Sequence, residues 1–215
     1  YTLGTIFERA GRDDAAISHY TAAVTRDPTA AQAYLRLADA LRRTGSLDAS
    51  LDGYQEVEHR EEARFGEIMA LARLGRFAEA RARVTVAIER YPRQPAFGHA
   101  MARILAAGDD DVRDGQRAFE LVQTIAEHNK TAAVAETMAM TFAELGRFSE
   151  AVEWQRFAMA IAADAGRADV AQAMSANLVR YQQDQPCRTP WRDDEPEYNP
   201  GLSVEPGLLE TNAPS

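Results

Sequence analysis

The chain has 215 residues, of which 46% are hydrophobic, and this is enough to bury a hydrophobic core. Its formal net charge of −9 argues against nucleic acid as a partner, and no apolar run approaches the length of a membrane span. The single cysteine, Cys187, excludes an internal disulfide framework and a cysteine-cluster zinc site. Alanine-rich helical patterns dominate and alternating β-branched runs are missing, so the sequence predicts an all-α fold.

Two helical apolar runs joined by a turn glycine form a unit that recurs along the chain. In residues 61–94, Gly75 separates a run that contains Leu71 from a second run that contains Ala80. Glycine permits the tight turn between antiparallel helices, and Pro92 cannot continue the second helix. One such hairpin leaves an apolar side uncovered, so neighbouring hairpins must stack on it.

The same pattern surrounds Gly11, Gly45 and Gly146. Gly11 and Gly45 are 34 residues apart, which is the period of the tetratricopeptide repeat. The chain therefore resembles the tetratricopeptide-repeat family over residues 1–165. The resemblance implies a right-handed superhelical solenoid of antiparallel helix pairs, in which the first helix of each pair lines a concave groove.

The glycine phasing divides the chain into repeats, a capping helix and a tail. The expected repeats are 1–30, 31–60, 61–94, 95–131 and 132–165, followed by a capping helix at 166–183 and an extended, acidic, proline-rich tail at 184–215. Gly45 and Gly75 are only 30 residues apart, which predicts a short second helix between them. By the same phasing Tyr1 already lies inside a first helix, so we expect sequence before it.

The turn within residues 95–131 is expanded and contains Asp109, Asp110 and Asp111. Such carboxylates suit helix caps or a calcium site. The spacing differs from that of an EF-hand loop, so a solvated turn with a helix cap is the favoured interpretation.

A narrower resemblance covers the C-terminal part of the repeats. The VRDG turn at 112–115, the EAVEWQ segment at 150–155, and the set Leu178, Tyr181 and Pro186 resemble a group of bacterial tetratricopeptide proteins. This likeness implies that the solenoid ends near residue 186, and it implies no reaction.

The composition changes from residue 184 onward. Residues 184–215 contain six prolines and carry a net charge of −5, and this proline density predicts an extended backbone. We expect the tail to dock through apolar side chains, among them Trp191, Tyr198, Leu202 and Leu208. Its acidic segment at 193–197 complements the arginines of the repeats.

Arginines recur at equivalent positions of the expected first helices. Arg9, Arg43 and Arg73 each lie two residues before a turn glycine. The candidate partner-binding residues of the groove are these three together with Arg36 and Arg103, and Arg42 could also widen the strip. Arginine favours planar contacts with carboxylates, so an acidic segment is the expected ligand. The alternative is an arginine face that contacts only solvent.

No part of the sequence carries the pattern of a catalytic or metal site. The four histidines lack a paired ligand spacing, a phosphate-binding glycine loop is missing, and Cys187 has no partner at redox spacing. We therefore expect no enzymatic activity, no cofactor and no metal.

Three hypotheses for the function follow. The favoured one is a noncatalytic scaffold that binds an extended, acidic segment of a protein partner in its groove. The second is a structural subunit of a larger bacterial assembly that docks its tail on a neighbouring subunit, or on a second copy as a homo-oligomer. The third is the regulatory repeat region of an enzyme whose catalytic domain precedes Tyr1.

The basic residues suggest an origin and a compartment. Lys130 is the only lysine beside 23 arginines, which suggests a GC-rich bacterial genome. A removed leader before Tyr1 would favour a periplasmic or exported location over a cytoplasmic one.

Overall fold

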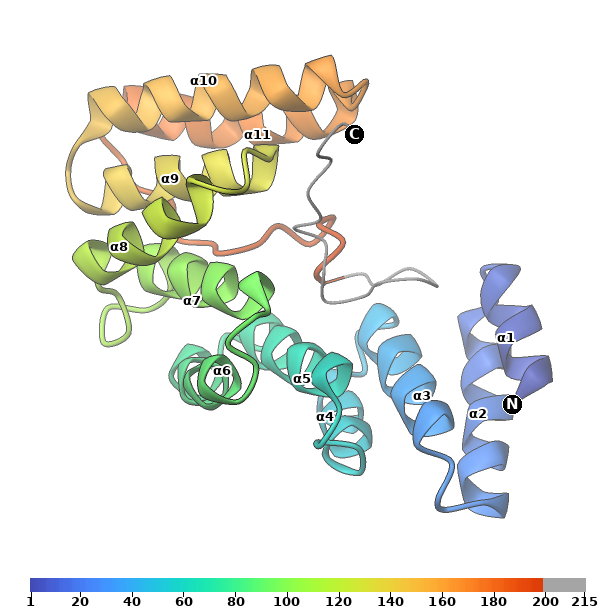
Figure 1. Ribbon diagram of the computed structural model, residues 1–215. Coiled ribbons are helices and arrows are strands. Elements are labelled where there is room, and N and C mark those ends of the chain that lie inside the picture. Colours follow the sequence, from blue (N-terminus) through green and yellow to red (C-terminus); the bar gives the residue numbers. More distant parts are fainter. Residues whose placement is uncertain (199–215) are drawn as a thin grey trace. The chain divides into compact units, whose positions relative to one another are not determined.

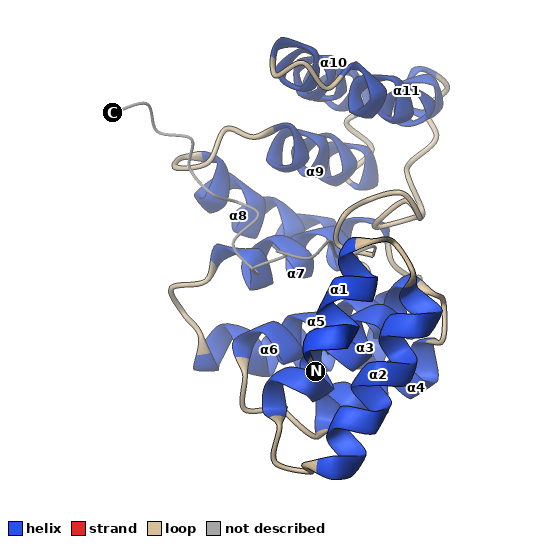
Figure 2. Ribbon diagram, turned by 90° about the vertical axis from the view of Figure 1, so that its right-hand side faces the viewer, coloured by secondary structure: helices blue, strands red, loops and turns tan. Residues whose placement is uncertain are grey.

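The computed structural model describes residues 1–198, and every regular element in that range is an α-helix (Figures 1 and 2). The helices are α1 (Thr2–Arg9), α2 (Asp13–Arg26), α3 (Ala31–Arg43), α4 (Leu47–Gln55), α5 (Glu61–Arg73), α6 (Phe77–Arg90), α7 (Pro95–Ala107), α8 (Gly115–Ala126), α9 (Ala132–Glu144), α10 (Phe148–Asp164) and α11 (Ala168–Gln182). The predicted all-α fold of antiparallel helix pairs is confirmed. Within residues 1–198, no helix has both the length and the apolar character needed to cross a membrane.

The described residues divide into two compact units. The first unit comprises Tyr1–Tyr91 with residues 191–198 and contains α1 to α6, and the second comprises Pro92–Pro190 and contains α7 to α11. In the first unit each helix packs against the next one along the chain, and α3 also packs against α5. In the second unit α9 packs against α7, α8 and α10, and α11 packs against α10.

Left-handed glycines form the turns inside most of the helix pairs. Gly11, Gly45, Gly75 and Gly146 have φ angles from 67° to 82°, a region that side chains with a Cβ rarely adopt. Each lies between the first and the second helix of a pair, as the sequence predicts. Gly166 has the same conformation between α10 and α11, so the capping helix is reached by the same kind of turn.

The turn from α7 to α8 depends on polar side chains instead. Arg113 donates hydrogen bonds to the main-chain oxygen of Gly108 at 2.8 Å and to Glu144 of α9 at 3.1 Å. Asp114 caps α8 by accepting a hydrogen bond from the main-chain N–H of Arg117 at 2.9 Å. The cap is therefore this aspartate and not the preceding run of aspartates. Among the described residues, no group of three or more His, Cys, Asp or Glu side chains could hold a metal ion.

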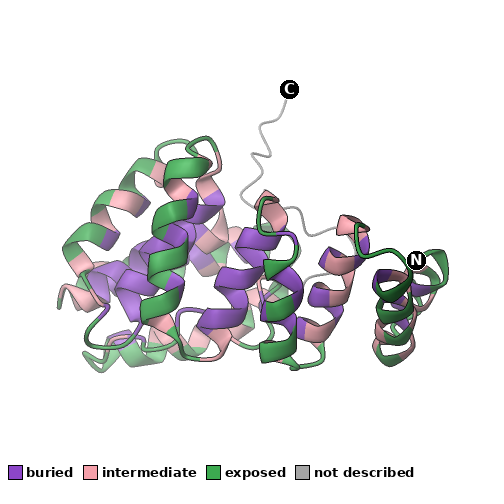
Figure 3. Cartoon of the chain, turned by 90° about the horizontal axis from the view of Figure 1, so that it is seen from below, coloured by how far each residue is buried: buried purple, intermediate pink, exposed green. Residues whose placement is uncertain are grey.

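From α5 to α10, burial separates the first helix of each pair from the second, and Figure 3 shows both largely buried and largely exposed helices. The first helix α9 packs against three helices and buries ten of its 13 residues, whereas α6 buries only a stripe of three residues among 14. Two of those three residues are alanines, Ala80 and Ala87, which allow the helices to approach closely. The second helix α4 has only 9 residues, as the short glycine spacing predicts.

In the first unit, two tyrosine rings each pack directly on a glycine of an adjacent helix. A Cβ atom added to Gly66 of α5 would lie 2.3 Å from Cζ of Tyr54 of α4. Similarly, a Cβ atom at Gly4 of α1 would lie 2.6 Å from the ring of Tyr20 of α2. Both tyrosines follow their turn glycine by nine residues, but Tyr20 packs on the first helix of its own pair and Tyr54 on the first helix of the next pair.

Candidate partner-binding surface

The first-helix face of the first unit is the surface formed by polar residues of α3 and α5, and its arginines tie successive helix pairs together. Arg43 donates hydrogen bonds to Glu8 at 2.8 Å and to Asp13 at 2.7 Å, both in the preceding pair. Arg73 donates a hydrogen bond to the main-chain oxygen of Arg42 at 2.8 Å. Two members of the predicted arginine row therefore hold the repeats in register, which neither of the sequence-based interpretations includes.

Two buried tyrosines fix the carboxylates beside these arginines. The Tyr20 hydroxyl donates to Glu8 at 2.6 Å, and the Tyr54 hydroxyl donates to Asp39 at 2.6 Å. Burial is the main reason that the pKa of each phenol lies above its ordinary value, so both remain hydrogen-bond donors. Arg42 donates from Nε to the Tyr54 hydroxyl at 3.0 Å. The orientation of Arg42 is therefore set within the repeats.

The chain's own residues 191–198 lie on this face. Arg42 donates a hydrogen bond from Nη1 to the main-chain oxygen of Glu197. Nε of Arg73 lies 3.9 Å from a carboxylate oxygen of Asp193, whose side chain is 90% exposed. The Arg42 contact is a hydrogen bond to the main chain of the segment, and the Arg73 contact is a weak surface ion pair.

Aromatic packing anchors the same segment. The guanidinium carbon of Arg73 lies 5.8 Å from the ring centre of Tyr198. The rings of Tyr198 and Trp191 have their centres 5.8 Å apart, and both residues are buried. The backbone of this segment forms hydrogen-bonded turns, since the N–H of Tyr198 donates to the oxygen of Glu195 at 3.0 Å. It is therefore less extended than its prolines predict.

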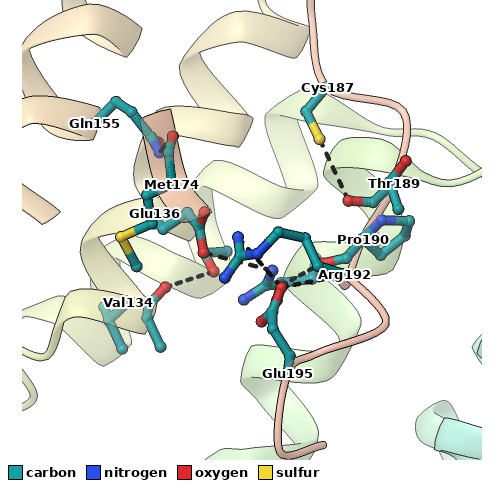
Figure 4. A network of polar contacts seen from close by, with 12 residues as sticks. Val134, Glu136, Gln155, Met174, Cys187, Thr189, Pro190, Arg192 and Glu195 are labelled. Carbon is teal, nitrogen blue, oxygen red and sulfur yellow. Dashed lines mark hydrogen bonds and ion pairs between the residues drawn. The ribbon is translucent and has the colours of Figure 1, made fainter. Parts of the chain in front are cut away.

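In the second unit the first-helix face is formed by polar residues of α7 and α9, and it holds the chain's residues 187–190 (Figure 4). Arg103 donates from Nε to the main-chain oxygen of Pro190 at 2.5 Å. Its Nη2 lies 3.7 Å from Glu136, and the two side chains are only 2% and 1% exposed. Arg103 was predicted to widen an exposed strip. The structure instead buries it against a carboxylate and the tail, so it is not open to a partner here.

Glu144 provides a second attachment for the tail in this unit. It accepts hydrogen bonds from Arg113 at 3.1 Å and from Arg188 at 2.6 Å. Glu144 occupies the position that is equivalent to Arg73 in the last repeat. The face is acidic there and binds a basic tail residue, Arg188, whereas the basic Arg73 faces the acidic Asp193. Burial raises the pKa of the nearby Cys187 thiol, which donates to the Thr189 oxygen at 3.3 Å and stays protonated.

The remaining predicted site residues have varied positions. Arg9 is exposed on α1, and Arg36 is half-buried on α3. Leu202 and Leu208 lie outside the described residues. Trp191 and Tyr198 pack in cis on the first unit, so tail docking on a neighbouring subunit stays a prediction.

Glu136 was missed by the sequence-based reasoning, although a signal for it exists. It is the only charged residue within AAVAETMAMTFA, a run whose other residues are apolar apart from two threonines, and Arg103 is the only Asp, Glu, Lys or Arg within AFGHAMARILAA. Lone opposite charges in two neighbouring buried helices predict a buried ion pair.

His99 gives the second unit a predicted dependence on pH. Its Nε2 lies 2.7 Å from the hydroxyl of Thr137, and burial, followed by the charge of Arg103, lowers the pKa of His99 to about 3. The unfolded chain therefore binds a proton that the folded unit excludes. The stability that the neutral ring contributes is fully present above about pH 6.5. It is lost as the pH falls toward 3, by up to about 1.4 kcal/mol for each pH unit.

Urea denaturation at about pH 7 and about pH 5 measures this dependence. The variant His99→Gln should lose less stability over this range than the wild type, whereas His128→Gln, at an exposed position, should behave like the wild type. Equal pH slopes for all three proteins would contradict the neutral, buried state of His99.

Comparisons with known proteins agree with this architecture. A family model described as tetratricopeptide repeat matches residues 1–63. The fold is similar to that of TTC0263, a thermophilic tetratricopeptide protein of Thermus thermophilus, with a TM-score of 0.59, 18% identity, and coverage of 85% of this chain and 95% of that chain. It is also similar to MamA, with a TM-score of 0.64, 15% identity, and coverage of 77% of this chain and 97% of that chain.

A third similar structure is a tetratricopeptide repeat protein from Parabacteroides merdae, with a TM-score of 0.65, 16% identity, and coverage of 84% of this chain and 74% of that chain. No curated protein sequence matches the chain. The fold thus defines an all-helical repeat protein, a class that suggests a scaffold for protein interactions. Over residues 1–63 the chain matches the tetratricopeptide-repeat family, and the three solved structures share the fold of the described residues.

Proposed function

We propose that the chain is a noncatalytic scaffold whose first-helix face binds a segment of a partner protein. Repeat proteins of this family are generally scaffolds without catalytic activity, which supports the proposal. The observation that carries it is the way in which the chain's own tail is held. Arg42 and Arg103 donate to the main-chain oxygens of Glu197 and Pro190. Every residue has such an oxygen, so this recognition suits polypeptide of many sequences.

The chemistry of the face favours acidic partners. Arg73 and Arg42 lie on the first-helix face of the first unit, with Arg36 half-buried and Arg9 exposed on neighbouring turns of α3 and α1. Guanidinium groups bind carboxylates with planar, charge-assisted hydrogen bonds. An acidic segment would therefore gain contacts here that a neutral segment would not.

A selection from a library of short random peptides displayed on phage tests this function. Peptides selected on the wild-type chain should bind Arg73→Glu about tenfold or more weakly, since a charge that attracts the ligand becomes one that repels it. The matched control is Arg81→Glu, which makes the same change on the exposed side of α6. Peptides that bind both variants equally would place the binding surface elsewhere, and a selection that enriches no peptide would count against the proposal.

A further inference from the structure

We infer that the surface covered by residues 191–198 is a binding site for an acidic, tyrosine-containing segment of a partner protein, and that the chain's own segment is its competing internal ligand. This inference rests on the proposed function and specifies the chemistry of the partner. Three contacts carry it: Arg42 binds a main-chain oxygen, and Arg73 faces both a tyrosine ring and a carboxylate.

The two arginines are positioned by the repeats and not by the segment. Nε of Arg42 is held by the Tyr54 hydroxyl at 3.0 Å, and that hydroxyl is held in turn by Asp39 at 2.6 Å. Nη1 of Arg73 is held by the main-chain oxygen of Arg42 at 2.8 Å. Departure of the segment leaves these bonds intact, so the site is organised in advance for another ligand. Such preorganisation lowers the entropic cost of binding.

Within the segment, one residue supplies most of the buried contact and another supplies the charge that faces Arg73. Tyr198 is only 4% exposed, and it packs between Arg73 and Trp191. Asp193, in contrast, is largely exposed and lies 3.9 Å from Arg73. A buried aromatic side chain supplies most of the affinity at such a site, whereas an exposed ion pair contributes little beyond orientation. The expected ligand therefore has a tyrosine as anchor and a carboxylate a few residues before it.

Covalent attachment makes the chain's own segment an effective competitor. It is joined to the folded repeats through Pro190, so its local concentration at the site is on the order of millimolar. A partner segment of the same chemistry binds only if its affinity and concentration are high enough to displace the internal segment. The affinity of the full chain for a partner is consequently set by how firmly residues 191–198 dock, as well as by the site itself.

Fluorescence anisotropy with a labelled peptide of sequence TPWRDDEPEY, residues 189–198, tests the inference on the full chain. Tyr198→Ser in the chain should weaken the internal ligand, and the peptide should then bind about tenfold more tightly than to the wild type. A peptide with serine in place of its tyrosine should bind at least tenfold more weakly to that variant. Adding Arg73→Glu to Tyr198→Ser should abolish the gain.

A second pair of variants keeps the test independent of the buried tyrosine. Asp193→Lys and Asp194→Lys make the same charge change at adjacent exposed positions, but only Asp193 faces Arg73, whereas Asp194 pairs with Arg192. Asp193→Lys should raise the peptide affinity about threefold, and Asp194→Lys should leave it within about a factor of 1.5. Circular dichroism melting curves establish that each variant is folded.

Equal peptide affinities for the wild type and Tyr198→Ser, or binding that persists in the presence of Arg73→Glu, would overturn the inference. The proposed function would survive that result if the phage selection returns peptides that depend on Arg73 but lack the acidic and aromatic pattern. If the selection enriches no peptide at all, the scaffold function itself fails.

Discussion

Replacement of Arg103 by methionine is expected to destabilise the second unit by about 3 to 5 kcal/mol, because a buried carboxylate then loses its cationic neighbour. The side chains of Arg103 and Glu136 are 2% and 1% exposed, so water cannot take over the role of the guanidinium. The same substitution removes the hydrogen bond to the main-chain oxygen of Pro190. Urea denaturation followed by far-ultraviolet circular dichroism should show the loss as a lower midpoint.

Two comparisons isolate the reason for this effect. Arg117→Met removes the guanidinium of an exposed ion pair with Glu120 on α8 and should change the stability by less than about 0.5 kcal/mol. The double variant Arg103→Met with Glu136→Leu should recover much of the loss, because the buried carboxylate is then removed together with the guanidinium. A double variant that is less stable than Arg103→Met alone would show that the damage comes from lost packing and not from the buried charge.

Replacement of Gly66 by alanine is expected to destabilise the first unit by about 2 kcal/mol, although alanine is the better helix former. The added Cβ would lie 2.3 Å from Cζ of Tyr54. That ring cannot easily move aside, because it is buried and its hydroxyl is bonded to Asp39 and Arg42. Thermal unfolding should show a lower midpoint.

Gly98 provides the matched control, since it also lies inside a first helix. A Cβ atom there would meet only Cδ1 of Ile125 at 3.5 Å, which is an ordinary contact. Gly98→Ala should therefore stabilise the chain by about 0.5 to 1 kcal/mol through its effect on helix propensity and on the unfolded state. The two substitutions should shift the midpoint in opposite directions. A midpoint that rises for both would mean that the ring of Tyr54 yields to the new methyl group.

Local rules explain why the helices and turns of this chain could be predicted from sequence. A helical apolar pattern interrupted by glycine has few alternative structures, and Gly11, Gly45, Gly75 and Gly146 all adopt the left-handed turn that their spacing predicts. The short α4 follows from the same spacing. These features involve residues close together in the chain, so no knowledge of distant contacts is needed.

The candidate site could be predicted only in part. Arg73 and Tyr198 were identified as a groove residue and a docking residue, and the structure brings them together. Arg43 had the same sequence signal as Arg73, yet it binds Glu8 and Asp13 of the preceding helix pair. Whether an arginine meets its own chain or a ligand depends on which carboxylates the stacking places beside it. A position relative to a turn glycine does not contain that information.

By itself the sequence determined the class of fold, because the 34-residue period and the turn glycines specify helix pairs through short-range sterics and apolar periodicity. Only the tertiary structure decided which partners the charged side chains contact. It buried Arg103 with Glu136, and it seated the chain's own tail on Arg42 and Arg73. These contacts join residues that lie from 33 to 155 positions apart, so they arise only when the packed helices bring distant side chains within bonding distance.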